Sequence, residues 1–192
     1  RKGDGRFRLR TSAGTEFDAG AVVVAAGVGS FQPRRLGVEG IESFEGTQIH
    51  YKVTSSSDFH GKRLAVFGGG DSALDWVMAL APHAAALTLV HRRADFRAQP
   101  ASVAKMRELE AAGKVRFIEG LAQSVSQSGG RLSGVTVKGN DGGEQAIDAE
   151  QVLVFFGLAP KLGPIAEWGL HLDKRAIVVD TEKFQSNIPG VF

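Results

Sequence analysis

The sequence predicts an α/β protein in which a parallel sheet carries helices and continues into a β-meander. Residues 64–67 form a short apolar run that a glycine turn and then apolar residues at helical spacing follow. Two more apolar runs, at 86–90 and 115–118, alternate with a second helical pattern, which is typical of parallel sheets. From Gln123 onward, glycine-rich turns separate successive strand patterns without a helix between them.

The composition excludes several classes of protein. The 192 residues have a net charge of +2, are 43% hydrophobic and include no cysteine. This length fits one domain or slightly more, and the apolar content is too high for a disordered chain. Without cysteine the chain has no disulfide, thiolate metal site or thiol nucleophile, so any redox chemistry needs a cofactor. We expect no metal site.

Charge and hydropathy also limit which partners and which cellular compartment we expect for this protein. A net charge of +2 is too small for a protein that coats nucleic acid, so we expect no nucleic-acid partner. No apolar run is long enough for a bilayer, and no secretory signal is visible, so we expect a cytoplasmic protein without a membrane contact. The chain begins at Arg1 and ends on an apolar phrase at 188–192, which suggests a piece of a longer chain.

The first fifty residues predict little regular structure. Phe7–Arg10 alternates apolar and basic residues, a turn follows at 11–14, and Ala21–Ala26 is continuously apolar. This pattern predicts a half-exposed hairpin that leads into a buried strand. Residues 27–50 carry glycine, proline and charge without periodicity, so we expect an irregular connection.

The central elements follow from apolar spacing. The strand at 64–67 precedes a helix that Pro82 ends, and its inward residues are Ala73, Trp76, Val77 and Leu80. After the strand at 86–90, Pro100 suits the first turn of a second helix, and Gly113 suits the position after its end. The inward residues of this helix are Val103, Met106 and Leu109.

The last third of the sequence predicts mainly strands. Turn residues at 128–130 and 140–143 separate the strands of the meander. Residues 151–157 form another continuous apolar strand, and the stretch 170–180 predicts a small hairpin.

A dinucleotide-binding motif stands between the first central strand and its helix. It reads Gly68-Gly69-Gly70-Asp71-Ser72-Ala73 and fits G-x-G-x-x-A in the context that gives this pattern meaning. Gly68 allows the tight turn, Gly70 leaves the backbone bare for a diphosphate, and Ala73 lets helix and strand pack closely. The N–H groups at the helix start would face the diphosphate, and Ser72 could donate to it. We expect the Asp71 carboxylate to accept from the helix's own N–H groups. The alternative is that the glycine turn only connects the strand to the helix and binds no nucleotide.

The end of the next strand predicts which dinucleotide is bound. An NAD site would place an acidic residue there, but this sequence has His91-Arg92-Arg93, with Arg97 close behind. Guanidinium groups form charge-assisted hydrogen bonds with a 2′-phosphate, so we predict NADP rather than NAD. The alternative is a solvated basic patch at a strand end.

These motifs, set between the apolar strands near Gly27 and Gly157, resemble the NADPH domain of thioredoxin reductase-like flavoproteins. The resemblance implies the FAD/NAD(P)-binding, Rossmann-like fold and covers nearly the whole chain. It also implies three parts: a partial FAD-domain segment with its connection at 1–49, an NADPH-binding domain at 50–157, and a truncated partial FAD-domain segment at 158–192. The phrase 187–192 is similar to the family's segment that leads into a Gly-Asp pair contacting FAD.

Thioredoxin reductases carry a Cys-x-x-Cys pair shortly before these glycines, where this sequence has Tyr51-Lys52-Val53-Thr54. The remaining pattern, at 51–58 and 71–76, is most similar to the ferredoxin or flavodoxin–NADP reductase branch. That resemblance implies FAD and NADP as cofactors, ferredoxin or flavodoxin as electron acceptor, and a homodimer when the protein is complete. We expect the fragment alone to be inactive, and no catalytic side chain is identified.

Two other functions stay open at this point. One is a thioredoxin reductase-like enzyme that reduces a disulfide or a small molecule, which a cysteine pair outside these residues would support. The other is a non-catalytic module that senses NADPH.

Overall fold

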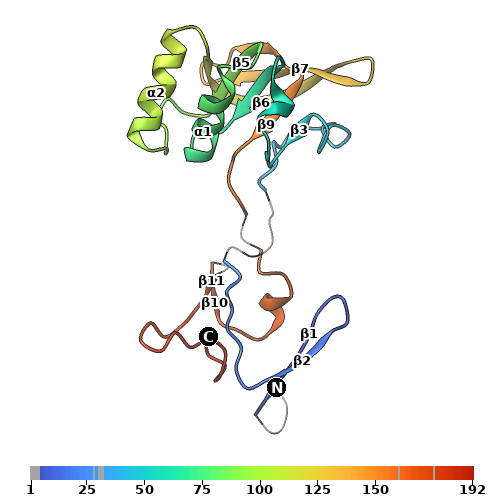
Figure 1. The fold of residues 1–192 in the computed structure, drawn as a ribbon, viewed down its shortest axis with the longest axis vertical. Helices are drawn as coiled ribbons and strands as arrows, with labels where there is room; N and C mark the ends of the chain where they lie inside the picture. Colours follow the sequence, from blue (N-terminus) through green and yellow to red (C-terminus); the bar gives the residue numbers. More distant parts are fainter. Residues whose placement is uncertain (1–4, 28, 30–32, 160, 175) are drawn as a thin grey trace. The chain divides into compact units, whose positions relative to one another are not determined.

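The computed structural model describes residues 5–27, 29, 33–159, 161–174 and 176–192 (Figure 1). The chain divides into two compact units, one made of residues 33–157 and the other of residues 1–32 together with 158–192. No helix in the described ranges is both long and apolar enough to cross a bilayer.

The unit 33–157 is built on a seven-stranded sheet with the order β3-β9-β4-β5-β6-β7-β8. Its strands are β3 (Ile49–His50), β4 (Arg63–Phe67), β5 (Ala86–His91), β6 (Arg116–Ser128), β7 (Arg131–Gly139), β8 (Glu144–Asp148) and β9 (Gln151–Val154). Strands β3, β9, β4 and β5 and the start of β6 are parallel, whereas the rest of β6 pairs antiparallel with β7, and β7 with β8. The predicted parallel sheet and meander therefore share one long strand, β6.

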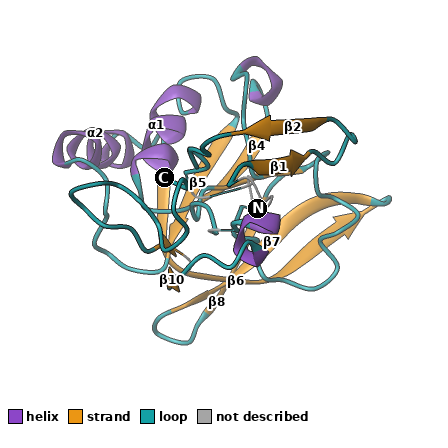
Figure 2. Ribbon diagram, turned by 90° about the horizontal axis from the view of Figure 1, so that it is seen from below, coloured by secondary structure: helices purple, strands orange, loops and turns teal. Residues whose placement is uncertain are grey.

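Two helices connect the parallel strands on one side of the sheet. Helix α1 (Asp71–Leu80) links β4 to β5 and helix α2 (Pro100–Ala111) links β5 to β6, while a short 3-10 turn, η1 (Ser57–Phe59), precedes β4. The two helices lie side by side in both views (Figures 1 and 2). Both agree with the spacing of apolar residues and with the Pro100 start.

The alternation of side chains along β4 divides the core in two. Leu64 and Val66 pack in the cluster that contains the buried residues of α1 and α2. Ala65 and Phe67 pack on the other side with buried residues of the meander, such as Val135. Successive strand residues point to opposite faces, so the parallel strands are covered by the helices on one face and by residues of the meander on the other.

Residues 33–49 belong to this unit rather than to the first segment of the chain. Four of their side chains are buried in the same cluster as Ile49, namely Leu36, Val38, Ile41 and Phe44. This compact unit therefore begins near residue 33, because these apolar side chains find their partners in the meander core. No spacing in this irregular stretch reveals that packing.

The other unit has little regular structure. It contains an antiparallel pair, β1 (Phe7–Arg10) with β2 (Glu16–Ala19), a 3-10 turn, η2 (Gly163–Glu167), and a second pair, β10 (Leu172–Asp173) with β11 (Ala176–Ile177). Both hairpins were expected from the sequence. A small cluster of Phe7, Leu170 and Val191 forms its buried core.

The expectation of a buried strand at Ala21–Ala26 is wrong for the described structure. This segment hydrogen-bonds with one neighbour: Val22 N donates to Gly190 O at 2.8 Å, and Val24 N donates to Phe192 O at 2.7 Å. The side chain of Val23 is 76% exposed. A continuous apolar run fits a strand buried on both faces, but here one face of the segment stays open.

Candidate functional site

The glycine turn lies where the order of the parallel strands reverses. It follows β4, which pairs with β5 on one side and with β9 on the other. The chain passes from β4 through α1 to β5, whereas β9 joins the opposite side only after the meander. Ligands of open α/β sheets bind at the carboxyl ends of the strands at such a reversal.

The three glycines of the turn have different surroundings. At Gly68, where φ is +148°, an added Cβ would lie 2.7 Å from the carbonyl oxygen of Phe155 and 2.9 Å from Cβ of the buried Ala73. At Gly69 an added Cβ would overlap the His91 ring. At Gly70 nothing lies within 4 Å. Packing against backbone therefore requires glycine at position 68, a side chain at position 69 would displace the His91 ring, and Gly70 is the glycine that borders open space.

The start of α1 offers backbone donors beside Gly70. Gly70 caps the helix, and its carbonyl oxygen accepts from the N–H groups of Ala73 at 3.0 Å and Leu74 at 3.2 Å. Within the described residues no acceptor is found for the N–H groups of Asp71 and Ser72, and both side chains are exposed. Free N–H groups and the helix dipole make such a helix start attractive to an anion.

The Asp71 carboxylate does not bond to its own helix, so that expectation is corrected. Its Oδ1 accepts from the backbone N–H of Gln99 at 2.7 Å, and Gln99 is the residue that precedes α2. The carboxylate therefore bridges the two helix starts and is engaged by a donor from the following loop. Sequence distance hides this contact, because Gln99 is 28 residues further along the chain.

Residues 92–97, in the loop between β5 and α2, are tied directly to the glycine turn. The backbone N–H of Arg97 donates to the carbonyl oxygen of Gly69 at 2.8 Å, and the N–H of Gly68 donates to the carbonyl oxygen of Val90 at 3.0 Å. The side chains of Arg92, Arg93 and Arg97 are exposed, and the described structure shows no ion pair to any of them. Three guanidinium groups that form no ion pair with any described residue thus stand on a loop bonded to the glycine turn.

His91 occupies a different position from the three arginines. Its ring lies against Gly69 and stacks on Phe96, with 5.4 Å between the ring centroids. Burial lowers its pKa below the ordinary 6.5, and the three neighbouring arginines lower it further, whereas a hydrogen bond with the backbone of Asp95 acts in the opposite direction. The His91 ring therefore packs against the glycine turn, and its lowered pKa disfavours the charged form of the imidazole beside the three arginines.

Two side chains that hydrogen-bond to the backbone of this loop were not predicted from the sequence. The Nδ2 of Asn140, in the turn between β7 and β8, donates to the carbonyl oxygen of Arg92 at 3.2 Å and also to a carboxylate oxygen of Glu119. Arg107 of α2 donates to the carbonyl oxygen of Ala94 at 3.4 Å. No local pattern marks either residue, because only the folded sheet brings them to the loop.

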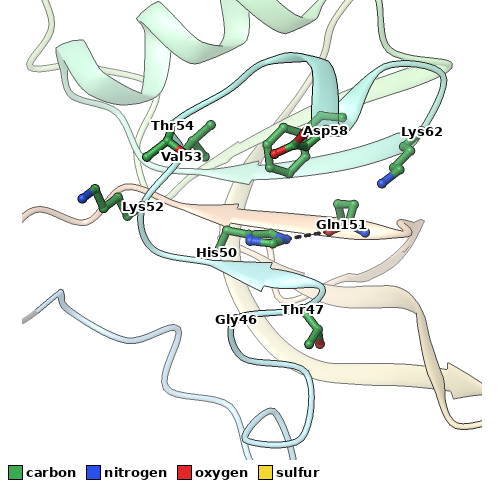
Figure 3. A pocket seen from close by; sticks show the side chains of 10 residues that line it. Gly46, Thr47, His50, Lys52, Val53, Thr54, Asp58, Lys62 and Gln151 are labelled. Atoms are coloured by element: carbon green, nitrogen blue, oxygen red, sulfur yellow. Dashed lines mark hydrogen bonds between the residues drawn. The ribbon is translucent and has the colours of Figure 1, made fainter.

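A separate cavity of about 280 Å³ lies at the other end of the parallel strands (Figure 3). Gln151 begins β9 and Lys62 directly precedes β4, so this cavity borders the amino ends of strands whose carboxyl ends face the glycine turn. His50 Nε2 and Gln151 Oε1 are 2.7 Å apart in its wall. The cavity is lined by Gly46, Thr47, His50, Lys52, Val53, Thr54, Asp58, Phe59, Lys62 and Gln151. None of the predicted site residues takes part.

Comparison with known proteins identifies the family. The match to the pyridine nucleotide-disulphide oxidoreductase family extends over residues 1–192. The chain belongs to this family. It is 53% identical over 192 residues to ferredoxin–NADP reductase 2 of Cupriavidus metallidurans, covering 100% of this chain and 52% of that protein. It is 50% identical over 196 residues to ferredoxin–NADP reductase of Methylibium petroleiphilum, covering 100% of this chain and 54% of that protein. The chain spans about half the length of the curated relatives it matches.

Solved structures of thioredoxin reductases share the fold of this chain. Thioredoxin reductase of T. acidophilum matches with a TM-score of 0.85 at 24% identity, covering 100% of this chain and 62% of that one. Thioredoxin reductase of Lactococcus lactis matches with a TM-score of 0.84 at 23% identity, covering 100% and 61%. The predicted α/β fold and the resemblance to thioredoxin reductase-like proteins are thereby confirmed.

Proposed function

We propose that this chain is the NADPH-binding part of a flavin-dependent oxidoreductase that passes hydride from NADPH to FAD and then electrons to ferredoxin or flavodoxin. The names of its relatives support this, since proteins 53% and 50% identical to it are called ferredoxin–NADP reductases. Membership of the pyridine nucleotide-disulphide oxidoreductase family supports a nicotinamide and a flavin cofactor.

One observation carries the proposal: the arginine-bearing loop and the glycine turn are hydrogen-bonded to each other through Arg97 N and Gly69 O at 2.8 Å. A dinucleotide whose diphosphate lies at Gly70 and the start of α1 would then have its 2′-phosphate near Arg92, Arg93 and Arg97. Each charge-assisted hydrogen bond to that phosphate would contribute about 1.5–3 kcal/mol. Such a ligand requires an open Gly70 and guanidinium groups that are free to bind it, and the described residues form no ion pair with Arg92, Arg93 or Arg97.

The absence of cysteine from these 192 residues favours an acceptor that needs no thiol. A bound flavin takes two electrons from NADPH and can release them singly, which suits a one-electron carrier. This chain's own residues would bind and orient the nucleotide. In the complete protein, we propose that residues 1–32 and 158–192 form part of the FAD domain and that the protein is a homodimer.

Titration of Arg92→Ala with Arg93→Ala tests the proposal. We expect the double variant to bind NADP⁺ at least tenfold more weakly, a loss of about 1.4 kcal/mol, while its affinity for NAD⁺ changes little. Isothermal calorimetry of the 192-residue chain measures both. Arg131→Ala removes an exposed arginine at the start of β7 and should alter neither affinity. Equal losses for the two nucleotides would contradict the assignment of a 2′-phosphate site.

A further inference from the structure

We propose that Arg107 is a positioning residue for recognition of the 2′-phosphate, because it holds residues 92–97 in the shape that presents their arginines. The inference rests on the proposed function. It adds a residue on α2 that would not touch the nucleotide and would act only through the loop.

Arg107 is fixed by four contacts. Its guanidinium carbon lies 4.9 Å from the ring centroid of Phe117 and 5.3 Å from that of Phe96, within the range of cation–π attraction. Its Nη1 lies 2.7 Å from a carboxylate oxygen of Glu110. Its Nη2 donates a long hydrogen bond of 3.4 Å to the carbonyl oxygen of Ala94, in the middle of the loop.

These contacts link α2 to the glycine turn through packed rings. Phe96 stacks on His91 at 5.4 Å and packs against Phe117 at 5.3 Å, and the His91 ring lies against Gly69. Arg107 therefore braces the ring that holds the central part of the loop. Asn140 bonds to the carbonyl oxygen of Arg92 at one end of the loop, and Gly69 bonds to Arg97 at the other.

The charge of Arg107 is already engaged, which separates its role from that of the three loop arginines. It pairs with Glu110 and stands over two aromatic rings, whereas the described structure gives Arg92, Arg93 and Arg97 no ion pair. If the loop samples other shapes, the apparent affinity falls in proportion to the population of the competent shape. Only ligands that need the loop arginines would then lose affinity.

The test compares adenosine 2′,5′-bisphosphate with adenosine 5′-monophosphate, which differ only in the 2′-phosphate. We expect Arg107→Met to weaken binding of the bisphosphate by about three- to tenfold and to leave the monophosphate within about twofold. Arg107→Lys keeps a cation over the rings but loses the planar guanidinium group. Its affinity for the bisphosphate should therefore lie between those of Arg107→Met and the parent. Lys105→Met is the matched control, because it removes an exposed ion pair to Glu108 on the same helix and should change neither affinity.

A loss confined to the bisphosphate supports the positioning role, and a purely structural defect would not produce it. Unchanged binding of the bisphosphate, or equal losses for both ligands in Arg107→Met and Arg107→Lys, would overturn the inference. The proposed function fails separately, if Arg92→Ala with Arg93→Ala shows no loss of preference for the 2′-phosphate. If that variant loses the preference while Arg107→Met keeps it, only the role of Arg107 is refuted.

Discussion

The substitution Gly70→Ala should weaken nucleotide binding without lowering the stability of the fold. Gly70 has φ −102° and ψ 178° at the cap of α1, a conformation that alanine adopts freely, and its Cβ would meet nothing within 4 Å. Alanine is a poorer cap than glycine by about 1 kcal/mol, but it also reduces the entropy of the unfolded chain by about 0.4–1 kcal/mol. The two effects offset each other, so we expect the free energy of unfolding to change by less than about 0.5 kcal/mol.

Nucleotide binding should respond very differently to the same methyl group. The added Cβ would stand in the open space where the diphosphate must approach the backbone, and a misplaced carbon in a closely packed contact costs about 1–3 kcal/mol. We therefore expect Gly70→Ala to bind NADP⁺ and NAD⁺ about five- to 150-fold more weakly, since both carry the diphosphate. This joint loss distinguishes the turn from the arginine loop.

Gly68→Ala, unlike Gly70→Ala, should weaken the fold itself. Its Cβ would lie 2.7 Å from the Phe155 carbonyl oxygen and 2.9 Å from Ala73 Cβ, so overpacking alone should lower the free energy of unfolding by about 1–3 kcal/mol. Urea unfolding and calorimetric titration of both variants measure the two quantities. If Gly70→Ala binds NADP⁺ like the parent at unchanged stability, the reasoning about the glycine turn is refuted.

Two further predictions concern stability. Gln48 is 6% exposed, donates to the carbonyl oxygens of Leu132 and Glu150 and accepts from Leu132 N, so Gln48→Ala should lower the free energy of unfolding in urea by about 2–4 kcal/mol. An exposed control, Gln127→Ala, should change it by less than about 0.5 kcal/mol, and equal effects would refute the role of Gln48. Because the pKa of His91 is lowered below 6.5 in the folded state, the unfolded chain takes up a proton first as the pH falls. Stability should therefore decrease from about pH 7.5 to about pH 5.5, and less so in His91→Gln; identical pH profiles would contradict this.

Local patterns predicted the central elements because they depend on short-range physics. The strand at 64–67, the helix that follows the glycines and the helix that begins at Pro100 each combine apolar spacing with a start or stop residue. Helix α1 ends at Leu80, close to the predicted stop at Pro82. Met106 is completely buried, as its place on the inward stripe of α2 required.

Features that depend on distant partners were not visible in the sequence. Strand β6 runs for 13 residues through a change of pairing partner, whereas the sequence predicted one strand at 115–118 and a separate strand of the meander from Gln123. At Gly120 an added Cβ would lie 2.5 Å from the Lys138 carbonyl oxygen, a close approach that only the paired strand explains. The hydrogen bond that the backbone N–H of Gln99 donates to the Asp71 carboxylate depends on tertiary structure in the same way.

In the site, too, the sequence predicted the local motifs but not the features that depend on tertiary structure. The sequence pattern located the glycine turn and the arginines, but it could not separate the packing role of Gly69 from the open position of Gly70. It also grouped His91 with the arginines, although burial and ring stacking give this side chain a different role. Spacing along the chain reports neither burial nor the charge state that burial produces.

A crystal structure of the chain with NADP⁺ would test the central claim most directly. We predict that the diphosphate lies at Gly70 and the first N–H groups of α1, and that the 2′-phosphate lies about 2.7–3.2 Å from guanidinium nitrogens of Arg92, Arg93 or Arg97. An adenosine bound elsewhere, such as in the cavity beside His50 and Gln151, or a 2′-phosphate pointing away from these arginines, would contradict it.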